Sequence, residues 1–133
     1  GSAIVAALAS PNSPIACITG DGSWLMSGQE ITTALQQRLP IFYIILNDAA
    51  LGMVKHGQRL AGAEATGFEL PVVDYVAMAR ATGANGFIIE TASDLLNINA
   101  QQLISQRRPT VLDVRIDPEE VPPTDIRMKV LLD

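Results

Sequence analysis

The stretch that decides the fold runs from Gly20 to Met53 and reads GDGSWLMSGQEITTALQQRLPIFYIILNDAALGM. Two short apolar runs, residues 15–18 and 41–46, each lead into a loop that contains an aspartate with glycine nearby. Apolar runs of this length, bounded by turn residues, predict strands, and the segment between them is long enough for a helix. Because a strand–helix–strand unit favours parallel pairing, we expect an α/β domain with a mostly parallel sheet and helices on both faces.

The two loops are predicted to meet at one edge of that sheet. Both leave the carboxyl ends of parallel strands, so Asp21 and Asp48 are expected to approach each other. Two oxygen-bearing side chains on converging loops suit a hard cation such as Mg2+, which commonly shares its shell with phosphate oxygens. Gly20, Gly22 and Gly52 leave room for backbone N–H groups to face an anion. The pattern favours a metal-bridged diphosphate site; for either loop alone, the alternative is a glycine turn with a solvated aspartate.

The order of these residues resembles the binding motif for thiamin diphosphate. The motif is matched by GDGS at residues 20–23, a helix-length segment, a strand, and then ND at residues 47–48. The continuation LGMV at residues 51–54 is similar to the acetolactate (acetohydroxyacid) synthase group of thiamin-diphosphate-dependent enzymes. The resemblance extends over nearly the whole chain. It implies that residues 1–133 form a single thiamin-diphosphate (pyrophosphate) binding domain, as the C-terminal fragment of a longer enzyme.

The resemblance also implies roles for individual residues. Asp21 and Asp48 would be ligands of Mg2+, and the carbonyl of Ala50 would supply a third oxygen. The predicted contacts to the cofactor diphosphate are Gly20, Gly22, Ser23, Gly52 and Met53. No residue here matches the glutamate that activates the aminopyrimidine, which in the family belongs to a pyrimidine-binding domain supplied by a neighbouring subunit. We therefore predict no catalytic residue in this chain and expect the isolated fragment to be inactive.

In the enzymes that the chain resembles, thiamin diphosphate provides the difficult chemistry. A 2-oxo acid, here expected to be pyruvate, is decarboxylated, and the product is ligated to a second carbonyl compound. The resemblance thus implies a homo-oligomeric transferase or lyase. Its partners would be the 2-oxo acid substrate and the pyrimidine-binding domain of the same or a neighbouring subunit. No basic segment precedes an apolar one at the start of the sequence, so no signal peptide is visible and a cytoplasmic location is expected.

Two positions depart from the pattern of the biosynthetic synthases. Asp48 stands where asparagine is usual, and Gly57 stands where tryptophan is expected in the pattern that reads MVKHGQ at residues 53–58. The missing tryptophan opens space beside the cofactor and leaves the substrate preference open. The alternatives are another thiamin-diphosphate-dependent decarboxylase or carboligase, or a non-catalytic cofactor-binding or assembly domain.

Composition limits the other classes of function. The chain has 133 residues, of which 48% are hydrophobic and 17% charged, so it is globular and long enough for one core. A net charge of −5 argues against nucleic-acid binding, and no apolar run approaches the roughly 20 residues that span a bilayer. The mean hydropathy of +0.25 indicates apolar surface that meets other domains or subunits. Cys17, the single cysteine, excludes an internal disulfide and is expected to be a buried small hydrophobe.

Further elements are predicted outside the central unit. The first two are a helix over 2–9 and a helix from a capping box at Ser27 and Glu30 to about residue 38. They are followed by a helix opened by Pro71 and Asp74 that stops at Gly83, a strand within 86–90, a helix capped by Ser93 that runs to about residue 106, and a strand over 110–116. A turn at 117–120 leads to an extended tail at Pro122 and Pro123. Residues 55–70 show a weak pattern, and we expect a mobile or partner-dependent segment near the site.

Several single residues invite functional interpretations. His56, the only histidine, is an acid–base or substrate-contact candidate, although an exposed loop position is the interpretation we favour. Trp24 is at least as well explained by core or interface packing as by a cofactor contact. The adjacent acids Glu119 and Glu120 are expected to be solvated. Ser23 lacks an evident activating partner, so a phosphate contact is favoured over nucleophilic attack.

Overall fold

The computed structural model describes residues 1–121, so the tail expected at Pro122 and Pro123 lies outside the described residues. One four-stranded sheet has the order β1-β2-β4-β3, and every neighbouring pair is parallel. The strands are β1 (Ile15–Gly20), β2 (Ile41–Asn47), β3 (Asn85–Ile89) and β4 (Thr110–Arg115). The predicted α/β class with a parallel sheet is confirmed.

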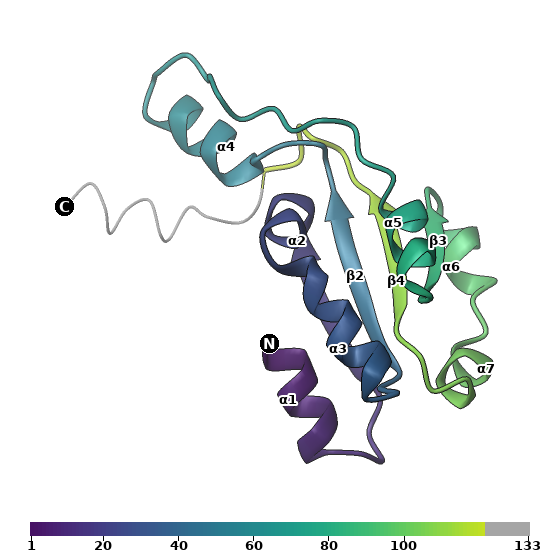
Figure 1. Ribbon diagram of the computed structural model, residues 1–133. Helices are drawn as coiled ribbons and strands as arrows, with labels where there is room; N and C mark the ends of the chain where they lie inside the picture. Colours follow the sequence, from purple (N-terminus) through teal and green to yellow (C-terminus); the bar gives the residue numbers. More distant parts are fainter. Residues whose placement is uncertain (122–133) are drawn as a thin grey trace.

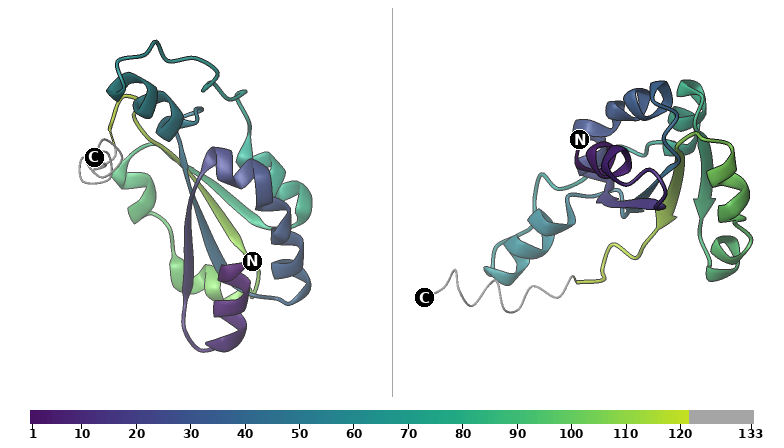
Figure 2. Two further views of the ribbon diagram at one scale, coloured as in Figure 1. Left: turned by 90° about the vertical axis from the view of Figure 1, so that its left-hand side faces the viewer. Right: turned by 90° about the horizontal axis from the view of Figure 1, so that it is seen from below.

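Helices pack around this sheet and extend beyond one end of it (Figures 1 and 2). They are α1 (Ser2–Ala9), α2 (Asp21–Ser27), the 3-10 turn η1 (Gly28–Glu30), α3 (Ile31–Gln36), α4 (Gly52–Leu60), α5 (Tyr75–Thr82), α6 (Ala92–Leu96) and α7 (Ala100–Ser105). The first three α-helices and α5 lie together on one side of the sheet, whereas α6 and α7 lie beside β3. Helix α4 stands past the carboxyl end of β2, away from the body of the domain. None of the helices within residues 1–121 has the length and apolar character needed to cross a membrane.

The core lies between the sheet and the helices α1, α2, α3 and α5. Alternate residues of β2, Ile41, Tyr43 and Ile45, are buried there, and the ring of Trp24 packs edge-on against Tyr43 with centroids 5.2 Å apart. Trp24 is therefore a core residue, as its packing interpretation predicted. The opposite side of β1 is less covered by the described residues, because Ile18 is 68% exposed. Cys17 is only half-buried, although it does pack against the core.

Helix α5 begins and ends where the sequence predicts. The Asp74 side chain accepts a hydrogen bond from the N–H of Ala77 at 2.7 Å, which satisfies one of the free donors of the first turn. Gly83 follows the last turn with φ +96°, a left-handed conformation that glycine adopts without strain. Close packing of α5 on β3 depends on Gly86, where an added Cβ would lie 3.1 Å from the carbonyl oxygen of Val76.

Two predicted helix starts are wrong. Ser27 does not cap a helix: it ends α2, and its hydroxyl donates to the carbonyl of Ser23 at 3.3 Å. The sequence interpretation missed α2, because its first residues were taken as a loop. Ser93 is not a cap either, since Thr91 and Asp94 form the capping box of α6. That helix ends at Leu96, and a new cap at Asn99, accepting from the N–H of Gln102 at 3.0 Å, starts α7.

Candidate functional site

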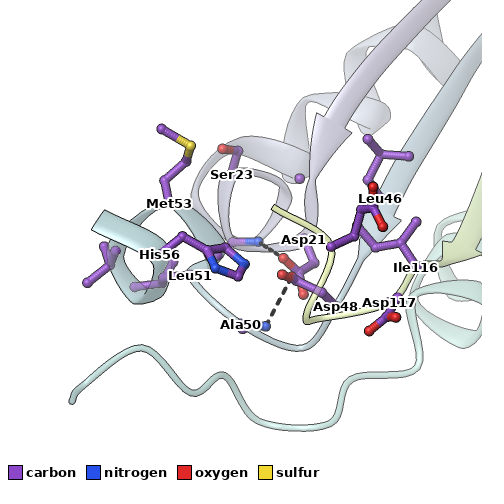
Figure 3. A pocket seen from close by; sticks show the side chains of 15 residues that line it. Asp21, Ser23, Leu46, Asp48, Ala50, Leu51, Met53, His56, Ile116 and Asp117 are labelled. Carbon is purple, nitrogen blue, oxygen red and sulfur yellow. Dashed lines mark hydrogen bonds between the residues drawn. The ribbon is translucent and has the colours of Figure 1, made fainter. Parts of the chain in front are cut away.

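The site lies at the carboxyl ends of β1 and β2. These strands are in register with Gly20 opposite Leu46, so the residues that follow them emerge side by side. Asp21 is the first residue of α2, and Asp48 lies in the turn between β2 and α4. Figure 3 shows the two carboxylates next to each other.

A cleft of about 680 Å³ opens at this edge of the sheet. It is lined by every residue that the sequence assigns to the metal or the diphosphate: Gly20, Asp21, Gly22, Ser23, Asp48, Ala50, Gly52 and Met53. The structure thus brings the whole predicted set together, while the role of each residue stays a prediction. The other lining residues have no metal or diphosphate assignment from the sequence; they are Leu46, Leu51, Val54, His56, Ile116, Asp117 and Glu120. Among them, His56 is the acid–base or substrate-contact candidate identified from the sequence.

Asp21 is a buried carboxylate with an unused acceptor. It is 2% exposed, and its Oδ1 accepts a hydrogen bond from the N–H of Gly22 at 2.7 Å. Its Oδ2 is buried and has no hydrogen-bond partner among the described residues. Burial raises the pKa of Asp21, as does the negative charge of Asp48, while the backbone N–H groups of Gly22, Ala49 and Ala50 lower it. An ionised carboxylate held here needs a cation, so the residues present fit a bound metal ion.

Asp48 lies in an irregular turn, residues 47–51, whereas Asp21 is the first residue of a helix. Ala49 has φ +53°, a left-handed conformation that is unfavourable for alanine by about 1 kcal/mol. Its N–H donates to Oδ1 of Asn47 at 3.1 Å, and the N–H of Ala50 donates to Oδ1 of Asp48 at 3.3 Å. Gly52 is required beside this turn, because an added Cβ would lie 2.8 Å from Oδ2 of Asp48.

The segment after α4 supports the same turn. Glu69 forms an antiparallel bridge with Ala50. Around it, the N–H of Leu51 donates to the carbonyl of Phe68 at 2.6 Å, and the N–H of Leu70 donates to the carbonyl of Ala49 at 3.0 Å. Residues 55–70 show a weak sequence pattern and were expected to be mobile or partner-dependent, but they form most of α4 and then this backbone support. Glycines within the segment hid the helix from a periodicity argument.

His56 lies on α4 and is 5% exposed, so the favoured interpretation of an exposed loop residue is wrong. Its side chain lines the cleft near the two carboxylates (Figure 3). A helix places residues three and four apart on one face, and His56 follows Gly52 and Met53 at these spacings. His56 thus contributes an imidazole to the cleft that is assigned to the diphosphate.

Ion pairs fix α4 to the chain that follows β4. We call this group of residues the clasp; it is formed by Lys55, Arg59 and Glu119. Lys55 is 4% exposed, and its ammonium group donates to Oε1 of Glu119 at 2.5 Å and to the carbonyl of Pro118 at 2.9 Å. Nη1 of Arg59 donates to the other carboxylate oxygen of Glu119, Oε2, at 2.6 Å. Hydrogen bonds from these two cations lower the pKa of Glu119 to about 2. Glu119 is thus exposed but paired, which the sequence interpretation did not predict.

The donor set leaves room for ligand oxygens around a metal. Within residues 1–121 there is no group of three or more His, Cys, Asp or Glu side chains placed to hold a metal ion. Two carboxylates and a backbone carbonyl make an incomplete shell for Mg2+, which prefers six oxygens and often takes some from phosphate. A metal ion bound by these groups would need further oxygens, which an anionic ligand such as a phosphate could supply.

A parallel α/β domain with paired carboxylates and glycines at its strand ends defines a cofactor-binding domain, of the kind that receives a phosphorylated ligand. The family described as "Thiamine pyrophosphate enzyme, C-terminal TPP binding domain" matches residues 1–114, and the chain belongs to this family. Thiamine pyrophosphate is thiamin diphosphate, so the resemblance seen in the sequence is confirmed.

Individual relatives agree with this membership. The chain is 35% identical over 125 residues to the acetolactate synthase isozyme 3 large subunit of Escherichia coli K12, covering 90% of this chain and 22% of that protein. It is also 35% identical over 126 residues to the acetolactate synthase large subunit of Buchnera aphidicola, with 90% and 22% covered. The crystal structure of benzoylformate decarboxylase from Polynucleobacter necessarius is similar with a TM-score of 0.78 and 29% identity, over 90% of this chain and 23% of that one. The chain therefore spans about a fifth of the length of these relatives.

Proposed function

We propose that this domain binds thiamin diphosphate through Mg2+ in an acetolactate-synthase-like enzyme. That enzyme would decarboxylate a 2-oxo acid, pyruvate in the simplest case, and ligate the product to a second carbonyl compound. The observation that carries the proposal is the buried Oδ2 of Asp21, which has no hydrogen-bond partner among the described residues and lies in one cleft with Asp48. The relatives named acetolactate synthase support the choice of reaction.

The residues of this chain would hold and orient the cofactor. Asp21, Asp48 and the carbonyl of Ala50 would bind Mg2+, which in turn would hold the diphosphate. The start of α4 at Gly52 presents backbone N–H groups and the positive end of the helix dipole to the same cleft, and the cleft is also lined by Met53. Gly20, Gly22 and Ser23 would contact the diphosphate from the start of α2. When bound, thiamin diphosphate supplies the chemistry for breaking and forming carbon–carbon bonds.

The remaining parts of the enzyme are assigned to chain beyond this domain. A pyrimidine-binding domain, from the same or a neighbouring subunit, would provide the activating glutamate. Supply by a neighbouring subunit would make the enzyme a homo-oligomer, which is the arrangement that we infer. We infer a cytoplasmic transferase or lyase and an inactive isolated fragment. Measurable decarboxylation of pyruvate by the 133-residue chain alone would contradict the last inference.

A second candidate is a thiamin-diphosphate-dependent decarboxylase or carboligase with another substrate. It is favoured by Gly57, where an added Cβ would meet nothing within 4 Å, so the position usually occupied by tryptophan is open. It is also favoured by the structural similarity to a protein named benzoylformate decarboxylase. Profiling the complete enzyme with pyruvate and with aromatic 2-oxo acids would separate the two candidates.

Calorimetric titration of thiamin diphosphate into the complete protein tests the binding proposal. We expect binding in the presence of Mg2+ that disappears when EDTA replaces the metal. Binding of equal strength in EDTA would contradict the metal assignment, and absence of binding in Mg2+ would contradict the proposed function. The same titration of the 133-residue chain would measure how much of the site this domain provides by itself.

A further inference from the structure

A buried polar pair lies directly behind the turn of residues 47–51. Nδ2 of Asn47, at the end of β2, donates to Oδ1 of Asp113, on the adjacent strand β4, at 2.8 Å. Asn47 is 4% exposed and Asp113 is not exposed at all. Neither residue is a predicted ligand. A carboxylate buried this deeply in a sheet is unusual and calls for a reason beyond packing.

The other side of the Asn47 amide supports the left-handed residue of the turn. Oδ1 of Asn47 accepts from the N–H of Ala49 at 3.1 Å, and the backbone carbonyl of Asn47 accepts from the N–H of Ile116 at 3.1 Å. An alanine at φ +53° persists only when surrounding contacts hold it there. Ala49 lies between Asp48 and Ala50, so this hydrogen bond, together with the contacts from residues 68–70, fixes the position of both groups assigned to the metal.

Asp113 determines which way the Asn47 amide faces. An ionised carboxylate can only accept hydrogen bonds, so the NH2 group of Asn47 must point to Asp113 and its oxygen must point to Ala49. The charge of Asp113 is balanced by Arg115, whose Nη2 lies 2.9 Å from Oδ2 as an ion pair without hydrogen-bond geometry. A group that could also donate at position 113 would allow the amide to turn over and leave the N–H of Ala49 without its acceptor.

We propose that Asp113 is a positioning residue for the Mg2+ site, which acts through Asn47 to hold the turn that presents Asp48 and the Ala50 carbonyl. The inference rests on the proposed function, because the metal is what the turn is placed to bind. It adds a residue from β4 to a site otherwise formed after β1 and β2.

An exchange of the two side chains tests this relation in the complete protein. Asn47→Asp puts two carboxylates face to face, and we expect Mg2+ to bind about 10- to 100-fold more weakly at saturating thiamin diphosphate, as for other partners of metal ligands. The double variant Asn47→Asp/Asp113→Asn restores a donor opposite an acceptor, with the acceptor still facing Ala49. We expect its Mg2+ affinity to return to within about threefold of the original. A double variant that binds Mg2+ no better than Asn47→Asp would overturn the proposal.

Asp113→Ser provides a second variant if Asn47→Asp does not fold. Serine is too short to reach Asn47 and adds no charge, so the same weakening of Mg2+ binding is expected. The matched control is Thr110→Val, a buried polar residue of the same strand at the end away from the cleft. It should lower the unfolding temperature while leaving Mg2+ affinity unchanged. A folded Asp113→Ser protein with the original Mg2+ affinity would also overturn the proposal.

Hydrogen exchange in the absence of metal and cofactor separates this inference from the proposed function. Asp113→Ser should speed exchange of the Ala49 amide, since its acceptor is no longer fixed, whether or not the protein binds Mg2+. Unchanged exchange at Ala49 would overturn the positioning role. Absence of Mg2+ binding by the unmodified protein would instead contradict the proposed function. The exchange result would then still decide whether Asp113 positions the turn.

Discussion

The chain holds Asp21 and Asp48, the two acidic residues of the cleft that are predicted metal ligands, by different means. β1 passes directly into α2, so Asp21 is placed by the regular backbone of a strand and a helix, and its nearest hydrogen bond comes from the next residue. β2 is followed by an irregular turn with a left-handed Ala49, and that turn depends on contacts from β4 and from residues 68–70. The first carboxylate is therefore fixed locally, and the second is fixed by parts of the chain that are distant in sequence.

The two carboxylates also differ in their burial and in their hydrogen bonding. Asp21 is 2% exposed and has a buried oxygen with no hydrogen-bond partner among the described residues. Asp48 is half-buried, and its Oδ1 accepts from the N–H of Ala50. A buried charge without a partner is far more costly than a partly solvated one. Removing Asp21 should thus have larger and more varied effects than changing Asp48.

The largest expected effect is that of Asp21→Asn in the complete protein. We expect Mg2+-dependent binding of thiamin diphosphate to weaken by about 100-fold or more, since loss of a charged ligand should exceed the effect of losing an outer partner. Calorimetry with and without Mg2+ measures this. Asp48→Ala, which removes the more solvated carboxylate, is the matched comparison and should have the smaller effect. Equal cofactor affinity in Asp21→Asn and the unmodified protein would remove the metal assignment.

The same substitution should stabilise the protein when no metal is bound. Burial and the charge of Asp48 raise the folded-state pKa of Asp21 above its ordinary value of 3.8, so the folded state holds the proton more tightly than the unfolded state. Stability then falls as pH rises from the unfolded pKa through the raised folded pKa, and the loss persists at neutral pH. Asp21→Asn removes this loss, and its unfolding temperature in EDTA should exceed that of the unmodified protein at neutral pH but not at acidic pH. A lower unfolding temperature throughout would contradict this.

Two glycine substitutions compare the supports of the two carboxylates. In Gly52→Ala the new Cβ would lie 2.8 Å from Oδ2 of Asp48, so the carboxylate must move and Mg2+ affinity should fall about tenfold. In Gly22→Ala the Cβ would lie 2.7 Å from Cδ2 of Leu51, the end of a flexible side chain, so a loss within about threefold is expected. Titration of Mg2+ at constant thiamin diphosphate measures both. A greater loss in Gly22→Ala would reverse the proposed difference between the loops.

Replacing Asp48 by the usual residue of the family should have little effect on affinity. Two carboxylates neutralise Mg2+ more fully than one carboxylate and an amide, which leaves less positive charge for the diphosphate. Asp48→Asn should therefore keep or tighten cofactor binding, by up to about threefold, in the same calorimetric titration. A loss of about tenfold or more would show that the second negative charge is required.

The difference between the loops also explains what could be predicted from the sequence. Asp21 follows an apolar run and lies between two glycines, and these local features predict both the strand end and a candidate metal ligand. The parallel sheet followed from the same strand–helix–strand pattern. Asp113, by contrast, lies within an apolar strand 66 residues after Asn47, and no local pattern relates it to the turn. The backbone support from Phe68 could not be foreseen either, because backbone hydrogen bonds have no signature in side-chain chemistry.

His56 and Glu119 show a second limit of sequence reasoning. Three glycines made residues 55–70 look irregular, yet Gly57 lies inside a helix that lines the cleft and also contacts the chain after β4 through Lys55 and Arg59. Helix propensity is a weak predictor where tertiary contacts hold a short helix in place. The ion pairs of the clasp join residues 60 or more positions apart, and only the fold shows that α4 is fixed from outside.

The smallest expected effect is that of the clasp on stability. Glu119→Gln removes the charge that pairs with Lys55 and Arg59, so the unfolding temperature at neutral pH should fall slightly, because the carboxylate is 61% exposed and screened by water. The pKa of Glu119 is lowered in the folded state to about 2, from 4.5. Its contribution is therefore fully present above about pH 4.5 and is lost as pH falls toward about 2, so the two proteins should converge in acid.

Glu120→Gln is the matched control for the clasp, since it removes the same charge one residue further along and leaves Glu119 in place. It should change the unfolding temperature less than Glu119→Gln does at neutral pH. Mg2+ affinity in Glu119→Gln should stay within about twofold of the original, because the turn that holds Asp48 has its own supports in Asn47 and Gly52. If Mg2+ affinity instead fell as much as in Gly52→Ala, the position of the Asp48 carboxylate would depend on the clasp as well as on β4.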